Sequence, residues 1–433
     1  MDFASPFSIS LVGITALAVL GLPIGYAMIA GSILYLLVAG QDMSIAAEQA
    51  LQGLRGSFVL LAVPLFILSA EFMNIGSLSN RLLRFCNTVV GRFRGGLGHV
   101  NIMVSVIFAG MSGSAIADAA GVGRIIIGMM IKDGRYTRSY AAAITAASAV
   151  IGPIIPPSIP MVLFALVSDA SIGYLFLGGA VPGLLMAAVL MVANTIVARH
   201  RSFPVEEPVS LRELPRATLN AIPALMMPVI LLGGIYGGVT TPTEAAAVAA
   251  AYAIAISITL YRDVSIRQAY TAVLASARAS ASIGLLISGA LVFNYVVTIE
   301  NIPNSLRAVL AGYELSPTTF LILVNIILLI LGCLLEGITI LLVIVPIFIP
   351  TANALGIDMV HFGVVVVVNI MIGLITPPYG LLLFVVSHVA RAPLWSIIRD
   401  TAPFLLVLIF ALMFITFVPD AVLWLPRLMG YAG

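Results

Sequence analysis

Residues 152–158 read GPIIPPS and place two adjacent prolines inside an almost purely apolar region. Proline has no backbone N–H and restricts the residue before it, so a regular helix is not expected to run through this point. At membrane depth, such a break is tolerated only where protein or a water-filled cavity covers the freed backbone groups. A near-copy, GLITPPY, follows 221 positions later (152 to 373) at residues 373–379. Matched breaks in two halves of a chain are typical of the binding site of a secondary transporter.

The composition indicates a polytopic integral membrane protein. Of 433 residues, 61% are hydrophobic and 9% are charged, whereas soluble domains carry roughly 25% charged residues. The net charge of +2 is too small to indicate nucleic-acid binding. Four arginines at positions 81, 84, 92 and 94 have no acid nearby, which places their loop on the cytoplasmic side of the bilayer.

Several kinds of enzyme and pump are excluded by motifs that the sequence lacks. Lys132 is the only lysine, and no Gly-Lys-Ser/Thr triplet occurs, so the chain has no Walker A loop for a nucleotide phosphate. Any uphill transport must therefore use an ion gradient or another chain. No nucleophile–base pair or zinc motif is evident, and Cys86 and Cys333 lie too far apart in sequence to indicate a shared metal site or a disulfide. We expect no enzymatic activity.

The two halves of the chain align beyond the prolines, because the same offset places Ser148 on Asn369 and Ser112 on Cys333. Each half contains a helix–turn–helix too short to span a membrane twice, followed by a broken helix. An odd number of crossings between the repeats would invert one relative to the other, and we expect inverted repeats. The predicted fold is an all-α integral membrane bundle with two re-entrant hairpins and two broken helices.

The predicted divisions follow from this pattern. An amphipathic arm helix, expected at the headgroup boundary, precedes each hairpin; an ordinary basic connecting loop is the alternative. The first apolar segment, at 7–39, is bent at Pro23 and contains either one span or two. The predicted divisions are N-terminal scaffold helices (1–56); repeat 1 (57–198) with arm helix (77–94), hairpin (97–132) and broken helix (138–168); a linker, scaffold helices and second arm helix (199–278, with the arm at 262–278); and repeat 2 (279–424) with hairpin (316–353) and broken helix (359–390).

The hairpin tips carry the residues expected to bind ions. Residues 110–118, GMSGSAIAD, are small and hydroxyl-bearing, and Na⁺ needs such neutral oxygens together with the carbonyls freed at a broken helix. The alternative is that these residues only permit close helix packing. In the second half, GCLLEG at 332–337 faces a break in which Thr376 supplies a hydroxyl that Ile155 cannot. The two predicted ion sites are therefore related but not equivalent.

Two acids and one arginine lie at membrane depth, where an ionisable side chain is a functional candidate. Asp118 and Glu336 could each balance a cation or accept a proton, and the alternative is a structural helix cap. Arg124 could meet an anionic substrate, pair with Asp118, or extend its charged end from the helix to the interface.

The chain resembles the large membrane subunit of the tripartite ATP-independent periplasmic (TRAP) transporters. The likeness covers nearly the whole chain, and its motifs are more specific than a general hydropathy match. They are GMSGSAIADAAGVG at 110–123, the alanine-rich segment 141–147, IGPIIPPSIP at 151–160, VPIFIP at 345–350, GID at 356–358, HFG at 361–363, Asn369, and IGLITPP at 372–378.

The resemblance implies an elevator-type secondary transporter in the bacterial inner membrane, driven by Na⁺. It implies a small four-helix membrane subunit (Q type) and a periplasmic substrate-binding protein (P type) that delivers a small carboxylate such as a C4-dicarboxylate or sialic acid. The sequence begins with large-subunit material, so the small subunit is expected on a separate chain. The implied Na⁺ ligands are Ser112, Gly152, Ile155 and Ser158 in one site, and Gly332, Gly373, Thr376 and Tyr379 in the other.

The hairpins and broken helices are expected to move against a static scaffold made of the N-terminal segment, the spans 172–198 and 218–261, and the arms. The family often has a small or hydroxyl residue where Arg124 stands, and an acid is common at the position of Glu336. The rival functions are a stand-alone divalent-anion/Na⁺ symporter, a membrane-embedded enzyme and a non-transporting scaffold. The candidates for substrate binding are Ser114, Asp118, Arg124, Ser148, Glu336 and Asn369.

Overall fold

The computed structural model describes residues 5–56, 58–75, 78–203, 213–261, 264–305 and 316–433, so parts of the predicted linker and the start of the second arm (262–263) lie outside the described residues. Every element in the described part is a helix, which confirms the all-α prediction. Six helical stretches there are long and apolar enough to cross a membrane. They are α11 (Ile172–His200), α12 (Leu214–Tyr236), α13 with the π-helix η4 (Pro242–Leu260), α14 (Ile266–Ile299), α17 to α18 (Gly337–Ala354) and α21 (Leu394–Phe417).

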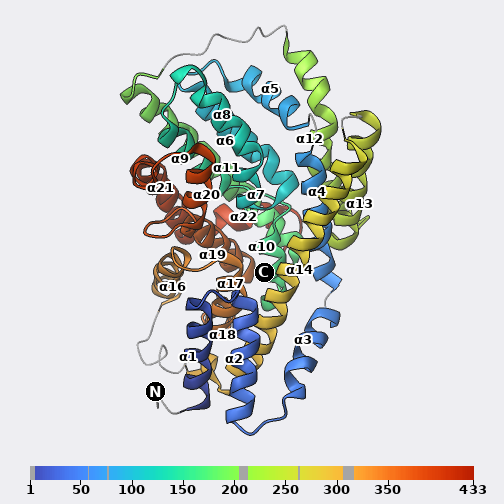
Figure 1. Cartoon of the computed structure of the whole chain (residues 1–433), viewed down its shortest axis with the longest axis vertical. Helices are drawn as coiled ribbons and strands as arrows, with labels where there is room; N and C mark the ends of the chain where they lie inside the picture. The colour runs from blue at the N-terminus through green and yellow to red at the C-terminus, as the bar shows by residue number, and fades with distance from the viewer. Residues whose placement is uncertain (1–4, 57, 76–77, 204–212, 262–263, 306–315) are drawn as a thin grey trace.

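The helices form two bundles that lie side by side (Figure 1). We call the first bundle the frame; in Figure 1 its first three helices lie at the bottom, and α4, α12, α13 and α14 lie on the right. It consists of α1 (Pro6–Val19), α2 (Ile24–Val38), α3 (Ser44–Gly56), the short helix η1 (Phe58–Leu61), α4 (Ala62–Asn74), α5 (Leu78–Val90), α12, α13 and α14.

We call the second bundle the core unit, and it contains both double prolines. Its first half comprises α6 (Gly96–Ser112), α7 (Ala115–Ala120), α8 (Val122–Ile131), α9 (Arg138–Ala149), α10 (Ile159–Ser168) and α11. Its second half comprises α16 (Pro317–Gly332), α17 (Gly337–Thr339), the π-helix η5 (Ile340–Ile344), α18 (Val345–Ala354), α19 (Met359–Gly373), α20 (Leu381–Ala390), α21 and α22 (Asp420–Leu428).

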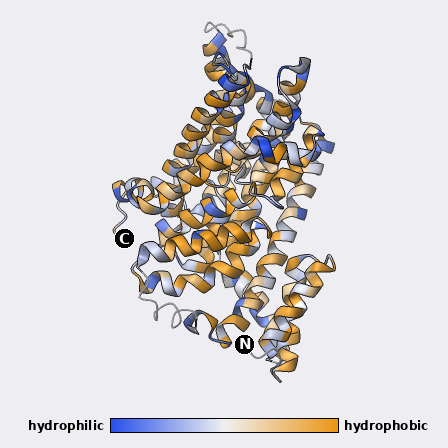
Figure 2. Ribbon diagram, turned by 90° about the vertical axis from the view of Figure 1, so that its left-hand side faces the viewer, coloured by the Kyte–Doolittle hydropathy of each residue, from blue (hydrophilic) through white to orange (hydrophobic). Residues whose placement is uncertain are grey.

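Hydrophobic residues predominate along most of the helices (Figure 2). Many of them point outward: Phe410 and Leu406 on α21 are 71% and 68% exposed. Contiguous apolar surface of this kind marks contact with lipid or another protein. The composition and the surface therefore agree on a multi-pass membrane protein.

The frame decides one open point of the sequence prediction and corrects another. The apolar segment 7–39, for which one span or two was expected, forms two helices, α1 and α2, which pack against each other on either side of the turn before Pro23. The predicted second arm is wrong as a separate element, because α14 runs without interruption from Ile266 to Ile299. A capping box between Ser265 and Gln268 starts this helix, and neither proline nor glycine occurs between residues 264 and 283 to end it.

Helix α11 also differs from expectation, since 172–198 was assigned to the static scaffold. The structure packs α11 against α6, α10, α19, α21 and α22, all within the core unit. Small residues on α11 allow this: a Cβ on Gly179 or Gly183 would collide with Ile154 or Ile155 of the first break. Glycines of this kind let helices approach closely in membrane proteins.

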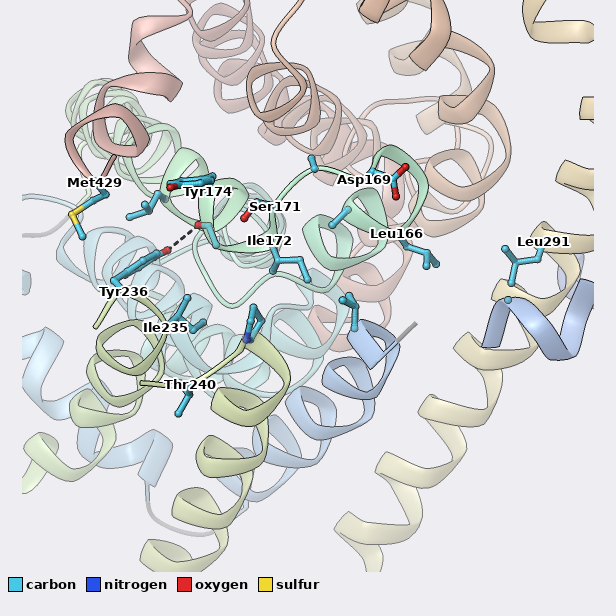
Figure 3. A pocket seen from close by; sticks show the side chains of 17 residues that line it. Leu166, Asp169, Ser171, Ile172, Tyr174, Ile235, Tyr236, Thr240, Leu291 and Met429 are labelled. Carbon is cyan, nitrogen blue, oxygen red and sulfur yellow. Dashed lines mark hydrogen bonds between the residues drawn. The ribbon is translucent and has the colours of Figure 1, made fainter. Parts of the chain in front are cut away.

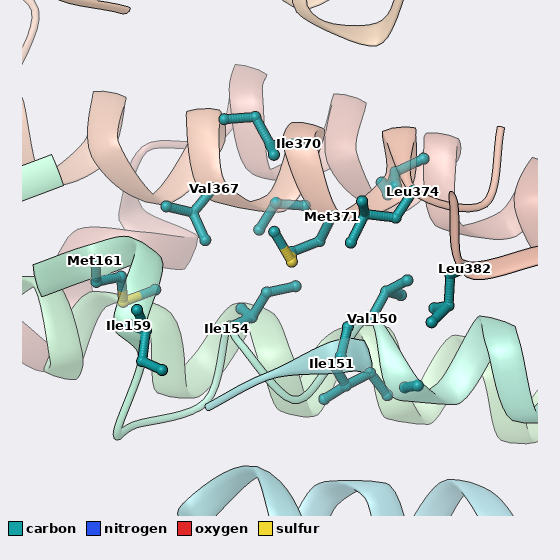
Figure 4. Packing of buried hydrophobic residues seen from close by; sticks show 14 of the residues in the cluster. Val150, Ile151, Ile154, Ile159, Met161, Val367, Ile370, Met371, Leu374 and Leu382 are labelled. Carbon is teal, nitrogen blue, oxygen red and sulfur yellow. The ribbon is translucent and has the colours of Figure 1, made fainter. Parts of the chain in front are cut away.

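The two breaks lie where the double prolines predict them. Helix α9 ends at Ala149 and α10 begins at Ile159, whereas α19 ends at Gly373 and α20 begins at Leu381. Pro156–Pro157 and Pro377–Pro378 are both cis peptide bonds. Figure 4 shows that apolar side chains of the first break, among them Val150, Ile151 and Ile154, face Val367, Met371 and Leu374 of the second half. The halves therefore meet in one apolar seam.

Close packing of α2 on α14 gives a stability prediction for the frame. A Cβ on Gly289 would lie 2.5 Å from the carbonyl oxygen of Gly25, whereas a Cβ on Gly284 of the same helix would meet nothing within 4 Å. We expect Gly289→Ala to destabilise the protein by about 1–3 kcal/mol through overpacking, and Gly284→Ala to leave stability nearly unchanged. Thermal unfolding of the two purified variants measures this; equal melting temperatures would contradict the close α2–α14 contact.

Candidate functional site

The first hairpin tip sits directly on the first break. Helix α6 ends at Ser112, Gly113 adopts a left-handed conformation (φ 60°), and Ser114 caps the start of α7 by accepting a hydrogen bond from the Ala117 N–H at 3.4 Å. A Cβ on Gly113 would lie 2.6 Å from the Pro157 carbonyl oxygen. Only glycine satisfies both the backbone conformation and this contact.

Three sequence-predicted residues meet behind this tip. The Ser112 hydroxyl donates a short hydrogen bond to Oδ1 of Asp118, and the other carboxyl oxygen, Oδ2, lies against Gly152, where a Cβ would collide with it. Asp118 is 4% exposed, and its Oδ2 has no hydrogen-bond partner among the described residues. A buried carboxyl oxygen without a partner is costly, so this arrangement favours a bound cation or proton.

The other two predicted ligands of the first ion site have more restricted roles. The Ser158 hydroxyl caps α10: it accepts a hydrogen bond from the Met161 N–H at 3.2 Å and donates to the Pro153 carbonyl. Ile155 packs its side chain against Gly183 of α11, which leaves only its backbone carbonyl for an ion. The Ser158 hydroxyl therefore holds the backbone of the break to the start of α10.

The second hairpin tip is seated on the second break through glycine backbones. A Cβ on Gly373 would lie 2.7 Å from Cα of Gly332, and the Gly380 N–H donates to the Cys333 carbonyl at 3.3 Å. The Thr376 hydroxyl donates to the Ile372 carbonyl at 2.8 Å and keeps lone pairs free on its oxygen. Tyr379 is 49% exposed beside Phe384. The structure thus brings Gly332, Gly373 and Thr376 together.

The two hairpin tips enclose a small cavity of about 90 Å³. Ser114 lines it from the first tip and Glu336 from the second, with Ile283 of α14 facing them from the frame. Glu336 accepts a hydrogen bond from the Thr339 hydroxyl at 3.3 Å and also lines a second cavity, of about 170 Å³, against α2 and α14. Of the substrate candidates, Ser114 and Glu336 are the pair that this cavity unites.

The remaining substrate candidates lie elsewhere. Ser148 is buried in a hydrogen-bonded network with Ser105. The Asn369 amide donates to the backbone carbonyl and to the side-chain oxygen of Asn325. Arg124 is exposed on α8. None of these three lines the cavity between the tips.

Two polar positions were not predicted, although the sequence carried a signal for them. Asn101 on α6 and Asn325 on α16 are each the one amide side chain in a largely apolar helix, and each donates to a threonine hydroxyl of another helix, Thr145 and Thr416 respectively. An isolated amide in such a helix needs a partner, because an unpaired buried polar group is destabilising. That rule identifies both residues from the sequence alone.

A larger cavity, of about 880 Å³, lies away from the tips, between the frame and the core unit (Figure 3). Tyr236 of the frame donates a hydrogen bond to the Gly173 carbonyl of the core unit across it, at 3.2 Å. Asp169 is the one charged residue among the described residues that line it. It shares no lining residue with the cavity between the hairpin tips, so we do not assign the substrate to it.

Comparison with known proteins adds a family to this geometry. The chain matches the model of the family "Tripartite ATP-independent periplasmic transporter, DctM component" over residues 11–421. It is 39% identical to the sialic acid TRAP transporter large permease protein SiaM of Vibrio cholerae, covering 98% of this chain and 99% of that protein. It is 43% identical to the C4-dicarboxylate TRAP transporter large permease protein DctM of Pseudomonas aeruginosa, covering 86% and 87%.

The fold is also similar to that of a solved transporter. The crystal structure of the YdaH transporter of Alcanivorax borkumensis superimposes with a TM-score of 0.62, covering 86% of this chain and 87% of that one at 14% identity. At this identity the similarity concerns the fold alone. The sequence matches carry the family assignment: this chain belongs to the DctM family, the large permease components of TRAP transporters, and is a transporter permease rather than an enzyme.

Proposed function

We propose that this permease carries a small organic acid across the bacterial inner membrane, coupled to Na⁺, by an elevator movement of the core unit against the frame. The observation that carries the proposal is the seating of each hairpin tip on its own double-proline break. Ser112 and Asp118 meet Gly152 in one half, and Gly332 meets Gly373 near Thr376 in the other. Freed carbonyls, hydroxyls and small residues converge at both places, as Na⁺ coordination requires.

The residues present suit a monovalent ion. Within the described residues, no three His, Cys, Asp or Glu side chains gather into one group, which is the kind of donor set that a structural zinc or calcium ion uses. The two proposed sites differ in charge: the first includes Asp118, whereas the second relies on the neutral oxygen of Thr376 and on backbone carbonyls. We infer that the first site binds Na⁺ more tightly, because its carboxyl can balance the ion's charge.

The proposed substrate is a C4-dicarboxylate or a sialic-acid-like acid, bound near Ser114 and Glu336 between the tips. Support comes from the relatives, whose names give sialic acid, C4-dicarboxylate, isethionate and 2,3-diketo-L-gulonate as transported acids. Because Glu336 would repel an anion, Na⁺ bound at the neighbouring tip is proposed to precede the substrate. A stand-alone divalent-anion/Na⁺ symporter, the earlier alternative, loses its support because the chain belongs to the DctM family.

The proposed partners are a small Q-type membrane subunit and a periplasmic P-type binding protein. The isethionate TRAP transporter permease protein DctMQ of Oleidesulfovibrio alaskensis is 36% identical to this chain. The aligned region covers 96% of this chain and 66% of that longer protein. The name DctMQ is consistent with a fused Q component. We propose that the same component joins this permease as a partner.

The elevator movement is supported by the contrast between the inside of the core unit and its contact with the frame. Within the core unit the two halves share the apolar seam of Figure 4. Between core unit and frame lie the 880 Å³ cavity and, among the described residues, the hydrogen bonds of Tyr236 to Gly173 and of Asn294 to the Leu342 carbonyl at 3.0 Å. A unit whose two halves are joined by an apolar seam can move as a rigid body against its neighbour.

Sodium coupling is tested in proteoliposomes that contain the permease with its small subunit and binding protein. We expect uptake to stop when Na⁺ is replaced by choline while a proton gradient is maintained. Uptake that continues unchanged under those conditions would overturn the Na⁺ proposal.

A single hydroxyl tests the second ion site. We expect Thr376→Ala to raise the Na⁺ concentration for half-maximal uptake roughly tenfold, because one lost ligand is worth about 1.4 kcal/mol. Thr401→Ala is the matched control, since its hydroxyl also donates to the carbonyl four residues earlier, at 2.8 Å, but far from the breaks in sequence and outside the tip contacts. Equal Na⁺ dependence in both variants, at equal expression, would remove Thr376 from the ion site.

Cross-linking tests the elevator movement. In a chain with Cys86 and Cys333 replaced by serine, cysteines at Gly173 and Tyr236 would join core unit to frame through a short bis-methanethiosulfonate reagent. We expect uptake to be lost and then restored by reduction. Cysteines at Phe58 and Thr243 are the control, because the Thr243 hydroxyl bonds the Phe58 carbonyl at 3.1 Å within the frame. If the first cross-link leaves uptake unchanged, the core unit does not move against the frame.

A further inference from the structure

A further cavity, smaller than the three described above, lies deep inside the first half of the core unit, between α6, α8 and α9. Its volume is about 10 Å³, which is the space of one water-sized particle. It shares Asp118 with the proposed ion site at the first break, whereas Ser112, Gly152, Ile155 and Ser158 do not border it. Its walls combine apolar side chains with four oxygen-bearing ones: Asn101, Ser105, Asp118 and Thr145.

Asp118 supplies the negative charge at this cavity. Its side chain lines the cavity, is 4% exposed, and has one carboxyl oxygen bonded to Ser112 and one without a partner in the described part of the chain. No basic side chain is among the lining residues. A buried carboxylate in this position needs a proton or a positive ion to balance it.

Each of the three neutral side chains donates a hydrogen bond to a neighbouring group and still has an oxygen that can accept or bind an ion. Asn101 donates its amide to the Thr145 hydroxyl at 2.6 Å, and Thr145 donates to the Ala141 carbonyl at 2.8 Å. Ser105 donates to the Ser148 hydroxyl at 3.0 Å, and Ser148 lies 3.2 Å from the Asn101 side-chain oxygen. Each of Asn101, Ser105 and Thr145 therefore keeps acceptor capacity on an oxygen.

The second half of the core unit provides a natural comparison. Thr416 donates to the Leu412 carbonyl at 2.8 Å and accepts the Asn325 amide at 3.0 Å, so an amide–hydroxyl pair of the same kind joins α16 to α21. It is not the repeat copy of the Asn101–Thr145 pair, because at the offset of 221 Asn101 falls on Ile322 and Thr145 on Val366. Asp118 falls on Thr339, so the charge is specific to the first half.

We propose that this cavity is a third monovalent-cation site, in which Asp118 provides the charge and Asn101, Ser105 and Thr145 provide neutral oxygens. One charged and three neutral oxygens in a space of this size suit Na⁺. The site rests on the proposed function in that Na⁺ is the ion taken. It adjoins the site at the first break, with which it shares Asp118, and takes its neutral oxygens from residues that do not belong to that site. An ion here holds α6, α8 and α9 together behind the hairpin tip.

The test counts bound ions with ²²Na⁺ on the purified full-length permease, without substrate, at fixed pH and with choline as the replacing cation. Ser105→Ala and Thr145→Val each remove one proposed ligand oxygen and touch neither break. We expect each to bind one Na⁺ fewer than the wild type at the same Na⁺ concentration, with the missing ion recovered only at roughly tenfold higher Na⁺. Thr416→Val is the matched control, because it removes the same kind of hydroxyl in the second half; it should bind as many ions as the wild type.

The outcomes separate this proposal from the proposed function. If Ser105→Ala and Thr145→Val bind as many Na⁺ as the wild type with the same affinity, while Thr376→Ala binds fewer, the sites at the breaks stand and the cavity holds water or Asp118 holds a proton. If the wild type binds no Na⁺, the sodium proposal itself fails. Thermal unfolding in choline confirms that each variant is folded, and Ser105→Ala decides the matter if Thr145→Val is unstable.

Discussion

The structure depends on one constraint: backbone groups freed by a double proline at membrane depth must be covered by protein. Each break meets this requirement in the same way. A hairpin tip covers one side, through Gly113 on Pro157 and through Gly332 on Gly373, and the opposite half covers the other side in the seam of Figure 4. Breaks, tips and seam are therefore parts of one arrangement, since removing any of them would leave unpaired peptide groups in an apolar surrounding.

The same arrangement explains why ion binding and rigidity occur together in the core unit. Peptide groups that cannot bond within a helix are available to an ion, and an ion that binds them joins a tip to its break. The halves reach this by different chemistry. The first half places Asp118 between Ser112 and Gly152, whereas the second half has Thr339 at the equivalent position and relies on the Thr376 hydroxyl. A duplicated backbone has thus acquired two unlike environments for a cation.

The frame follows a different principle. Its long helices α12, α13 and α14 satisfy their own backbone groups, and glycines such as Gly25 and Gly289 let them pack closely. Its contact with the core unit includes a cavity of about 880 Å³ and, among the described residues, the hydrogen bonds of Tyr236 and Asn294. A bundle complete in itself beside a bundle held together by breaks and tips is the physical basis of the movement proposed above.

The sequence by itself determined the all-helical membrane fold, the two breaks and the residues at both tips, because apolar content, proline and glycine constrain the local backbone wherever they occur. It predicted that Ser112 and Gly152 lie close together, and they do. Only the tertiary structure decided that α11 belongs to the core unit, that residues 266–299 form one helix, that the Ser158 hydroxyl is used as a cap, and that Asn101 and Thr145 share a cavity with Asp118. These outcomes depend on which surfaces of distant segments fit each other, and hydropathy and spacing along the chain do not record that fit.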